Sequence, residues 1–260
     1  MSAHVLRRFA AGGLLVPLAL LTACSSAAAG DGSGKLSIVA STDVYGDIAR
    51  QIAGADAQIT SIITDPAQDP HSYEADPRNQ LAIAKADIVI ENGGGYDDFV
   101  DSMLQAVGHP GTVLNAVKIS GHIAPPGGEL NEHVWYDFPS VQKLVARLVD
   151  ALTTAEPSDK ATFTANAATF VAKLKGLEAE EAQLKLAHQG DGAAITEPVP
   201  VYLLDACGLV DKTPTAFSDA VENGTGVPAF VLKQTLDLFS SGQVKLLAYN
   251  EQTSGPETQQ

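Results

Sequence analysis

Residues 36–63, LSIVASTDVYGDIARQIAGADAQITSII, contain the signals of a strand, a helix and a second strand in close succession. Residues 36–40 form a short apolar run that predicts a strand, and residues 44–53 place apolar side chains at helical spacing. Residues 58–63 then predict another strand. Because apolar strands alternate with a helix, we expect a parallel sheet that is covered by helices on both faces.

The alternation of helices and strands continues toward residue 155. Helices are predicted over 78–84, 96–107 and 140–154, and strands over 87–90 and 112–114. These elements predict a first α/β lobe. No internal sequence repeat is evident.

A long helical pattern follows Pro157 and extends to about His188. Roughly 30 helical residues span about 45 Å, and a helix of that length usually connects two parts of a globular chain. Beyond it, strands are predicted over 194–196 and 244–249, and helices over 199–206 and 231–239.

We therefore expect an α/β fold of two lobes, each a mainly parallel sheet flanked by helices, joined by one long rigid helix. The lobes are expected over residues 35–155 and 191–260. The connecting helix is expected over residues 156–190.

The N-terminal residues have the composition of an export signal. Arg7 and Arg8 precede an apolar stretch over residues 9–20, which is shorter than the about 20 residues that a membrane helix needs. This combination predicts a secretory signal peptide over residues 1–23. No second stretch of the sequence is apolar enough to predict a membrane span.

A lipid-attachment motif follows at the predicted cleavage site. Residues 21–24, LTAC, match the lipobox of bacterial lipoproteins, in which cleavage precedes the cysteine and the thiol carries diacylglycerol. The alternative is an ordinary small-residue cleavage site that happens to end in cysteine. The small residues over 24–34 predict a flexible tether. We expect a protein anchored to the cell membrane through Cys24, facing outside the cytoplasm.

The charge balance is strongly acidic. Sixteen Lys and Arg against 31 Asp and Glu give a net charge of −15, which becomes −17 without the two arginines of the signal peptide. Such a surface repels nucleic acid and anionic headgroups and favours nearby cations, although solubility alone also explains it. With Cys24 lipidated, Cys207 has no disulfide partner, and its apolar neighbours predict a buried thiol.

Several common enzyme motifs are absent from the sequence. It has no HExxH, GxSxG or GxxxxGK[ST] segment. Gly93, Gly94 and Gly95 follow a predicted strand, where α/β proteins bind phosphates, but the dinucleotide-binding spacing is not met. Asp97 and Asp98 would also repel an anion there, so a tight turn is predicted.

Two of the six histidines lie in polar loops between predicted elements. His71 lies in the segment DPHSYE (69–74), and His133 lies in NEHVWYD (131–137). A single histidine in a loop is more often solvated than a metal ligand, so neither segment alone establishes a metal site. The histidines expected at the surface are His109, His122 and His188.

Taken together, four segments resemble the metal-binding solute receptors of zinc and manganese ABC importers. Residues 69–87, DPHSYEADPRNQLAIAKAD, are similar to the family's first-ligand loop with the helix and strand that follow it. Residues 91–99, ENGGGYDDF, are similar to its next strand-to-helix turn. Residues 131–139, NEHVWYDFP, resemble its second-ligand segment, and residues 195–197, ITE, its third-ligand position. The resemblance extends from about residue 35 to the C-terminus.

The resemblance implies that His71, His133 and Glu197 bind one divalent transition-metal ion between the lobes. Two neutral imidazoles and one carboxylate suit Zn²⁺ or Mn²⁺, and Fe²⁺ as well. It also implies a receptor, not an enzyme, that delivers the ion to the membrane permease of an ABC importer with its cytoplasmic ATPase. No nucleic-acid partner is expected.

The sequence departs from the family's pattern near its end. Members usually supply a fourth ligand, an acid, from a later loop that precedes a final strand and helix. Here the sequence stops at Gln260, soon after the strand predicted over 244–249. The second lobe is therefore expected to be incomplete, with water or a nearby acid such as Glu251 completing the site.

Two other functions are compatible with the residues alone. Two histidines and a carboxylate with an open position could form a hydrolytic metal site, although no general base accompanies them at a recognisable spacing. A surface lipoprotein with an adhesive or degenerate role, no longer binding metal, is the other. Metal titration and a hydrolysis assay distinguish both from the receptor.

Overall fold

The computed structural model describes residues 34–74, 76–108, 111–253 and 255–260. The predicted signal peptide, Cys24, nearly all of the tether and His109 lie outside these residues. Residues 35–260 form one compact unit. Among the described residues, no helix is both long and apolar enough to cross a bilayer.

The first sheet has four parallel strands in the order β2-β1-β3-β4. The strands are β1 (Leu36–Thr42), β2 (Ala57–Ile63), β3 (Ile88–Glu91) and β4 (Thr112–Asn115). The two central strands are buried on both faces, as Ile38 and Val89 show with no exposed surface. This confirms the parallel sheet that the apolar runs predicted.

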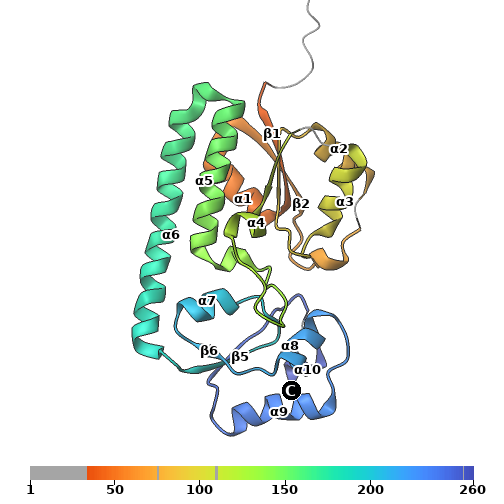
Figure 1. Cartoon of the computed structure of the whole chain (residues 1–260), viewed down its shortest axis with the longest axis vertical. Helices are drawn as coiled ribbons and strands as arrows, with labels where there is room; N and C mark the ends of the chain where they lie inside the picture. The colour runs from red at the N-terminus through yellow and green to blue at the C-terminus, as the bar shows by residue number, and fades with distance from the viewer. Residues whose placement is uncertain (1–33, 75, 109–110, 254) are drawn as a thin grey trace, which may run out of the picture. The chain divides into compact units, whose positions relative to one another are not determined.

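Helices cover both faces of this sheet (Figure 1). The side chains of Ile38 and Ile88 pack with Leu148 and Phe163 in the larger core, which lies on one face. The alternate side chains of Val39 and Val89 face the other way. The helices on the first face are α1 (Asp43–Ala53), α5 (Phe138–Ala155) and α6 (Lys160–His188), and those on the second are α2 (Pro77–Lys85) and α3 (Asp98–Val107).

Local sequence explains how two of these helices are placed. The Asp76 carboxylate accepts hydrogen bonds from the backbone N–H groups of Arg78 and Asn79, which caps the start of α2. In α1, a Cβ at Gly46 would lie 2.0 Å from Oγ of Ser61 on β2. A larger residue at position 46 would therefore displace the Ser61 hydroxyl, so glycine favours this close packing of α1 on the sheet.

The long helix predicted from the sequence is present. A short 3-10 helix, η4 (Pro157–Asp159), leads into α6, which has 29 residues. α6 packs on α1 and α5 of the first lobe and on α7 (Val201–Ala206) of the second. The helix therefore joins the two lobes, as its length indicated.

The second lobe contains a sheet of three short parallel strands in the order β6-β5-β7. The strands are β5 (Gly192–Ile195), β6 (Val210–Asp211) and β7 (Leu246–Ala248). After α7, the remaining helices are α8 (Thr215–Glu222), α9 (Ala229–Ser240) and α10 (Pro256–Gln259). Cys207 is buried without a disulfide, and burial raises the pKa of its thiol, as predicted for a structural cysteine.

Apart from short 3-10 helices, four described elements were not predicted from the sequence: α4 (Ala116–Ser120), β6, α8 and α10. Each is short, and periodicity is a weak signal over so few residues. The helix predicted over 199–206 begins only at Val201, because Pro200 precedes its first turn. Of these differences, the omission of α8 affects the functional site.

Candidate metal centre

A pocket of about 520 Å³ lies where the carboxyl ends of both sheets meet. Thr42 and Ile63, the last residues of β1 and β2, line it from the first lobe. Glu197 follows β5 and Asn250 follows β7, and both line it from the second lobe. Ligands bind at this end of parallel sheets because the loops after the strands converge there.

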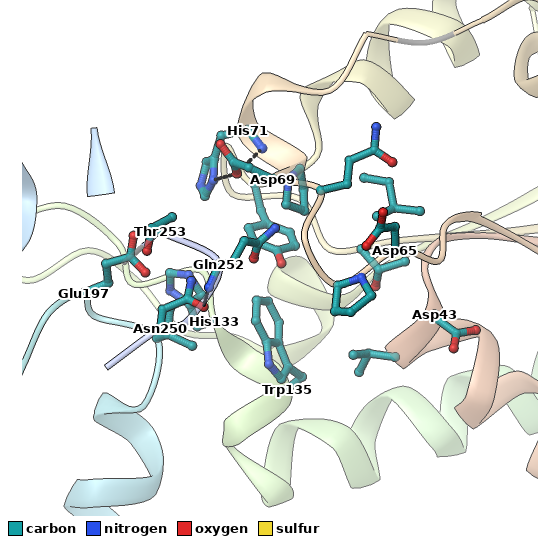
Figure 2. A pocket seen from close by; sticks show the side chains of 18 of the residues that line it. Asp43, Asp65, Asp69, His71, His133, Trp135, Glu197, Asn250, Gln252 and Thr253 are labelled. Atoms are coloured by element: carbon teal, nitrogen blue, oxygen red, sulfur yellow. Dashed lines mark hydrogen bonds and ion pairs between the residues drawn. The ribbon is translucent and has the colours of Figure 1, made fainter. Parts of the chain in front are cut away.

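His71 lies in a short 3-10 helix, η2 (Pro70–Ser72), and Asp69 orients its ring. The Asp69 carboxylate accepts from the His71 backbone N–H at 3.0 Å and lies 3.0 Å from Nδ1 of the ring (Figure 2). Nε2 lies 3.2 Å from Oε1 of Glu132. The hydrogen bond to Glu132 raises the pKa of His71 to about 9, so the ring must lose a proton when Nε2 binds a metal.

His133 is buried just before the 3-10 helix η3 (Val134–Tyr136). Its Nδ1 lies 2.8 Å from Oδ1 of Asn131, and the amide nitrogen of Asn131 donates to the carbonyl of Pro198 at 3.0 Å. With the amide in this orientation Oδ1 is an acceptor, so Nδ1 carries the proton and Nε2 keeps a lone pair. Burial lowers the pKa of His133 to about 4, which keeps the ring in the neutral form that binds metals.

The ring of Tyr96 packs between the two histidines. Its centroid lies 5.1 Å from that of His71, 5.7 Å from that of His133 and 4.8 Å from that of Trp135. These edge and tilted contacts restrict the rotation of both imidazoles. The aromatic cluster therefore holds the histidines near each other although they come from distant loops.

The turn that precedes Tyr96 confirms one prediction. Gly93 has φ 75°, and a Cβ there would lie 2.1 Å from Nδ2 of Asn115, so only glycine fits. The Asp97 carboxylate accepts from the backbone N–H groups of Asn92 and Gly93, each at 2.7 Å. An internal carboxylate thus occupies the position that a phosphate would need, as expected for a tight turn.

Unsatisfied buried oxygens concentrate at the pocket. Among the described residues, seven buried side-chain oxygens have no hydrogen-bond partner, and three of them belong to residues that line this pocket. They are Oε2 of Glu197, Oε1 of Glu222 and Oγ1 of Thr253. No Lys or Arg is among the described lining residues. Because a buried carboxylate needs a proton or a cation, this end of the pocket is suited to a cation.

The most compact group of ligand atoms comes from both lobes. One atom each from His71, Glu132 and Glu222 lie within 4.8 Å of one another. Nε2 of His133 lies 4.0 Å from Oε1 of Glu222. Burial, followed by the nearby Glu132 carboxylate, raises the pKa of Glu222 to about 7.

The structure brings together most of the residues that the sequence predicted. His71, His133 and Glu197 all line the pocket (Figure 2), although the compact group contains only His71 of the three. Glu251 is exposed and is not among the lining residues. His122, expected at the surface, is only partly exposed, because it stacks on a tyrosine ring and bonds an aspartate.

Three residues of the site were not predicted: Asn131, Glu132 and Glu222. Asn131 and Glu132 directly precede His133 in the sequence. A polar residue beside a candidate metal ligand could have been predicted to orient that ligand by a hydrogen bond. Glu222 had no such signal, because it lies at the end of the unpredicted helix α8.

Comparison with family models identifies the family of this chain. Residues 38–260 match the model described as zinc-uptake complex component A, periplasmic (ZnuA). The chain belongs to this family. Members are substrate-binding components of transport systems and not enzymes, and divalent metal ions are the ligands that relatives are named for.

Two curated relatives are both named for manganese. The manganese ABC transporter substrate-binding lipoprotein ScaA of Streptococcus gordonii is 26% identical over 255 residues, covering 86% of this chain and 81% of ScaA. The manganese-binding lipoprotein MntA of Halalkalibacterium halodurans is 29% identical over 148 residues, covering 57% of this chain. The matched part spans about half of MntA, 49%.

Solved structures of the family share the fold. The periplasmic zinc-binding protein TroA from Treponema pallidum aligns with a TM-score of 0.68 at 18% identity, covering 81% of this chain and 76% of TroA. At this identity the likeness establishes the arrangement of two α/β lobes on a long helix.

Proposed function

We propose that this chain captures a divalent transition-metal ion in the pocket between its lobes and delivers it to an ABC importer. The observation that carries the proposal is the meeting of two imidazoles with an unpartnered buried carboxylate, in a pocket that the described residues line without Lys or Arg. Family membership supports the same function.

His71, His133 and Glu197 are the proposed ligands of the ion. The Nδ1 atoms of both histidines face oxygen acceptors, and Nε2 of His133 is left for the ion. A partner that fixes one ring nitrogen in this way is typical of metal-binding histidines. Nε2 of His71 lies 3.2 Å from Oε1 of Glu132 and has to exchange this partner for the ion. Zn²⁺ and Mn²⁺ both suit two imidazoles and a carboxylate, and Fe²⁺ is also compatible.

The ion's destination is proposed to be the membrane permease of an ABC importer that is driven by a cytoplasmic ATPase. Lipid on Cys24, with residues 24–34 as the tether, would keep the receptor beside the permease outside the cytoplasm. We expect Cys24→Ser to abolish the lipid mass addition and to release the protein from the membrane fraction. Mass spectrometry of the purified chain measures the first effect.

The binding step is tested by calorimetric titration of the purified, chelator-treated full chain. We expect one equivalent of Zn²⁺ or Mn²⁺ to bind, and His71→Ala or His133→Ala to weaken binding by about 100-fold or more. His188→Ala is the matched control, since His188 is exposed and pairs with Asp191. Unchanged stoichiometry and affinity in both ligand variants would refute the site.

The identity of the ion requires a competition experiment. Imidazoles and the general affinity order favour Zn²⁺, whereas carboxylate oxygen favours the harder Mn²⁺. The chain is equilibrated with both ions at fixed free concentrations, and the bound metal is measured by elemental analysis. We expect Zn²⁺ to bind more tightly in this assay, so that Mn²⁺ is retained only when it is in large excess.

A further inference from the structure

Helix α8 ends inside the pocket and carries a carboxylate that the three proposed ligands do not explain. Glu222 is its last helical residue, and Oε1 is buried without a hydrogen-bond partner. The same oxygen lies 4.0 Å from Nε2 of His133. Two donor atoms that bind one ion at about 2.0–2.2 Å in a tetrahedron are roughly 3.3 Å apart. These two atoms would therefore have to approach each other by less than ~1 Å to bind the same ion.

A second, independent observation concerns Glu197. This side chain is 4% exposed, and its Oε2 atom is buried without a partner at the same pocket. Glu197 comes from the loop after β5, whereas Glu222 comes from α8, so the two carboxylates reach the pocket from different elements. Among the described lining residues no Lys or Arg faces these two acids, and the His71 ring is already hydrogen-bonded to Glu132. Two buried carboxylates in this position are a costly arrangement unless a cation binds between them.

The neighbouring acid Glu132 differs from Glu222 in one respect. Its Oε1 atom is already hydrogen-bonded to Nε2 of His71 at 3.2 Å. Oε1 of Glu132 therefore has a hydrogen-bond partner within the protein. The buried oxygens of Glu197 and Glu222 have no such partner among the described residues. An ion that binds Nε2 of His71 would take that nitrogen from Glu132 and gain the two unpartnered carboxylates.

The geometry points to Glu222 as a fourth protein ligand of the ion, beside His71, His133 and Glu197. This inference rests on the proposed function. Each lobe then supplies two ligands, imidazoles from the first and carboxylates from the second. The two negative charges balance a divalent ion, and four protein donors close the tetrahedral positions that three ligands leave open. No solvent position is then needed for the ion to be held.

The test uses Glu222→Gln in the purified, chelator-treated full chain. Glutamine keeps the shape of the side chain and removes its charge, so the metal-free melting temperature should not fall. We expect Zn²⁺ affinity to drop by about 100-fold, with an altered visible absorption spectrum of bound Co²⁺, which reports the ligand set. Glu222→Asp withdraws the carboxylate by one methylene and should lower the affinity by about 10-fold, so the test remains valid if Glu222→Gln fails to fold.

Three further variants separate the explanations. Asp219→Asn changes an exposed acid of the same helix and serves as the control. Glu132→Gln and Glu251→Gln represent the rival acids. Glu251 is exposed and outside the pocket lining, so Glu251→Gln should leave the Co²⁺ spectrum close to that of the wild type. A spectral change in Glu132→Gln that exceeds the change in Glu222→Gln would assign the fourth position to Glu132 and overturn the inference. A wild-type spectrum and affinity in Glu222→Gln would overturn the inference while leaving the proposed function intact. Absence of metal binding in the wild type would overturn the proposed function itself.

Discussion

The two lobes of this protein differ sharply in how much apolar surface they bury. The first has a four-stranded sheet with buried clusters on both faces, and residues such as Leu148 and Phe163 are completely buried. The main buried cluster of the second consists of Ala193, Ile195 and Leu204. Its large exposed apolar side chains, each at least 36% exposed, are Val210, Phe230, Leu236, Phe239, Leu246, Leu247 and Tyr249.

The two lobes therefore contribute differently to the stability of the fold and to the supply of metal ligands. The first lobe provides most of the hydrophobic stabilisation and both histidines, whereas the second provides the unpartnered oxygens on a thin scaffold. Segments with few buried contacts open more readily than a large core. An ion that binds both lobes is therefore expected to stabilise the second lobe more than the first.

The largest effect is expected from Leu148→Ala, in the core of the first lobe. Leu148 on α5 has no exposed surface, so its truncation removes buried methyl groups and leaves a cavity. We expect the free energy of unfolding to fall by about 4 kcal/mol. Urea denaturation followed by circular dichroism measures it. A loss below about 1 kcal/mol would show that this core is not the main source of stability.

A smaller and more local effect is expected from Leu204→Ala, in the second lobe. Leu204 is 6% exposed but packs in a small cluster that can relax, so we expect a loss of about 2 kcal/mol. Hydrogen exchange should rise in residues 191–253 and not in the first sheet. Leu186→Ala is the matched control, because Leu186 is 80% exposed. Equal exchange increases in both lobes would contradict the contrast between them.

A buried acid of the first lobe, away from the pocket, offers a pH test. Burial raises the pKa of Glu91 to about 7, although Asn115 donates a hydrogen bond to it at 2.8 Å. Because the folded pKa lies above the ordinary value of 4.5, this group's stabilisation is complete below that value and is lost as the pH rises to about 7. Glu91→Gln should remove this loss, so the variant should gain stability relative to the wild type as the pH rises from 4 to 8.

Thermal unfolding of the wild type and of Glu91→Gln across this pH range measures the difference. The exposed residue Glu129 supplies the control Glu129→Gln. Parallel pH profiles for the wild type and Glu91→Gln would show that Glu91 ionises without cost.

The smallest effect is expected from Phe230→Ser on α9. The ring is 70% exposed, and an exposed side chain contributes little to the free energy of unfolding. We expect a change within about 0.5 kcal/mol in the same urea titration. A loss of more than about 1.5 kcal/mol would mean that this face of the second lobe is covered in solution, for example by self-association, which sedimentation analysis would detect.

The contrast between the lobes also explains what the sequence could predict. β1 and β3 are apolar on both faces, and α6 is long, so composition and periodicity identify them without tertiary information. α8 buries Phe217, Ser218 and Ala220, only one of which is large and apolar. The helix has only eight residues, and a periodic pattern is a weak signal over so short a segment. The lobe built from short elements is therefore the harder one to predict.

The candidate site divides in the same way. His71 and His133 stand in polar loops whose composition attracts attention, and resemblance to a family extended the set to Glu197. Glu222 depends on where α8 packs, which is a tertiary property that a single sequence does not reveal. Glu251 was suggested by nearness along the chain, and the structure shows that nearness along the chain does not bring it to the pocket.

The side chain of Asn131 links two events that would otherwise be separate. Its amide oxygen faces a ring nitrogen of His133, while its amide nitrogen donates to the Pro198 carbonyl in the opposite lobe. The planar amide of Asn131 therefore couples the orientation of the His133 ring to the distance between the lobes. If the lobes move apart, the His133 ring either turns with the second lobe or loses its hydrogen bond to Asn131. Opening of the pocket and weaker binding of the ion would then occur in the same motion.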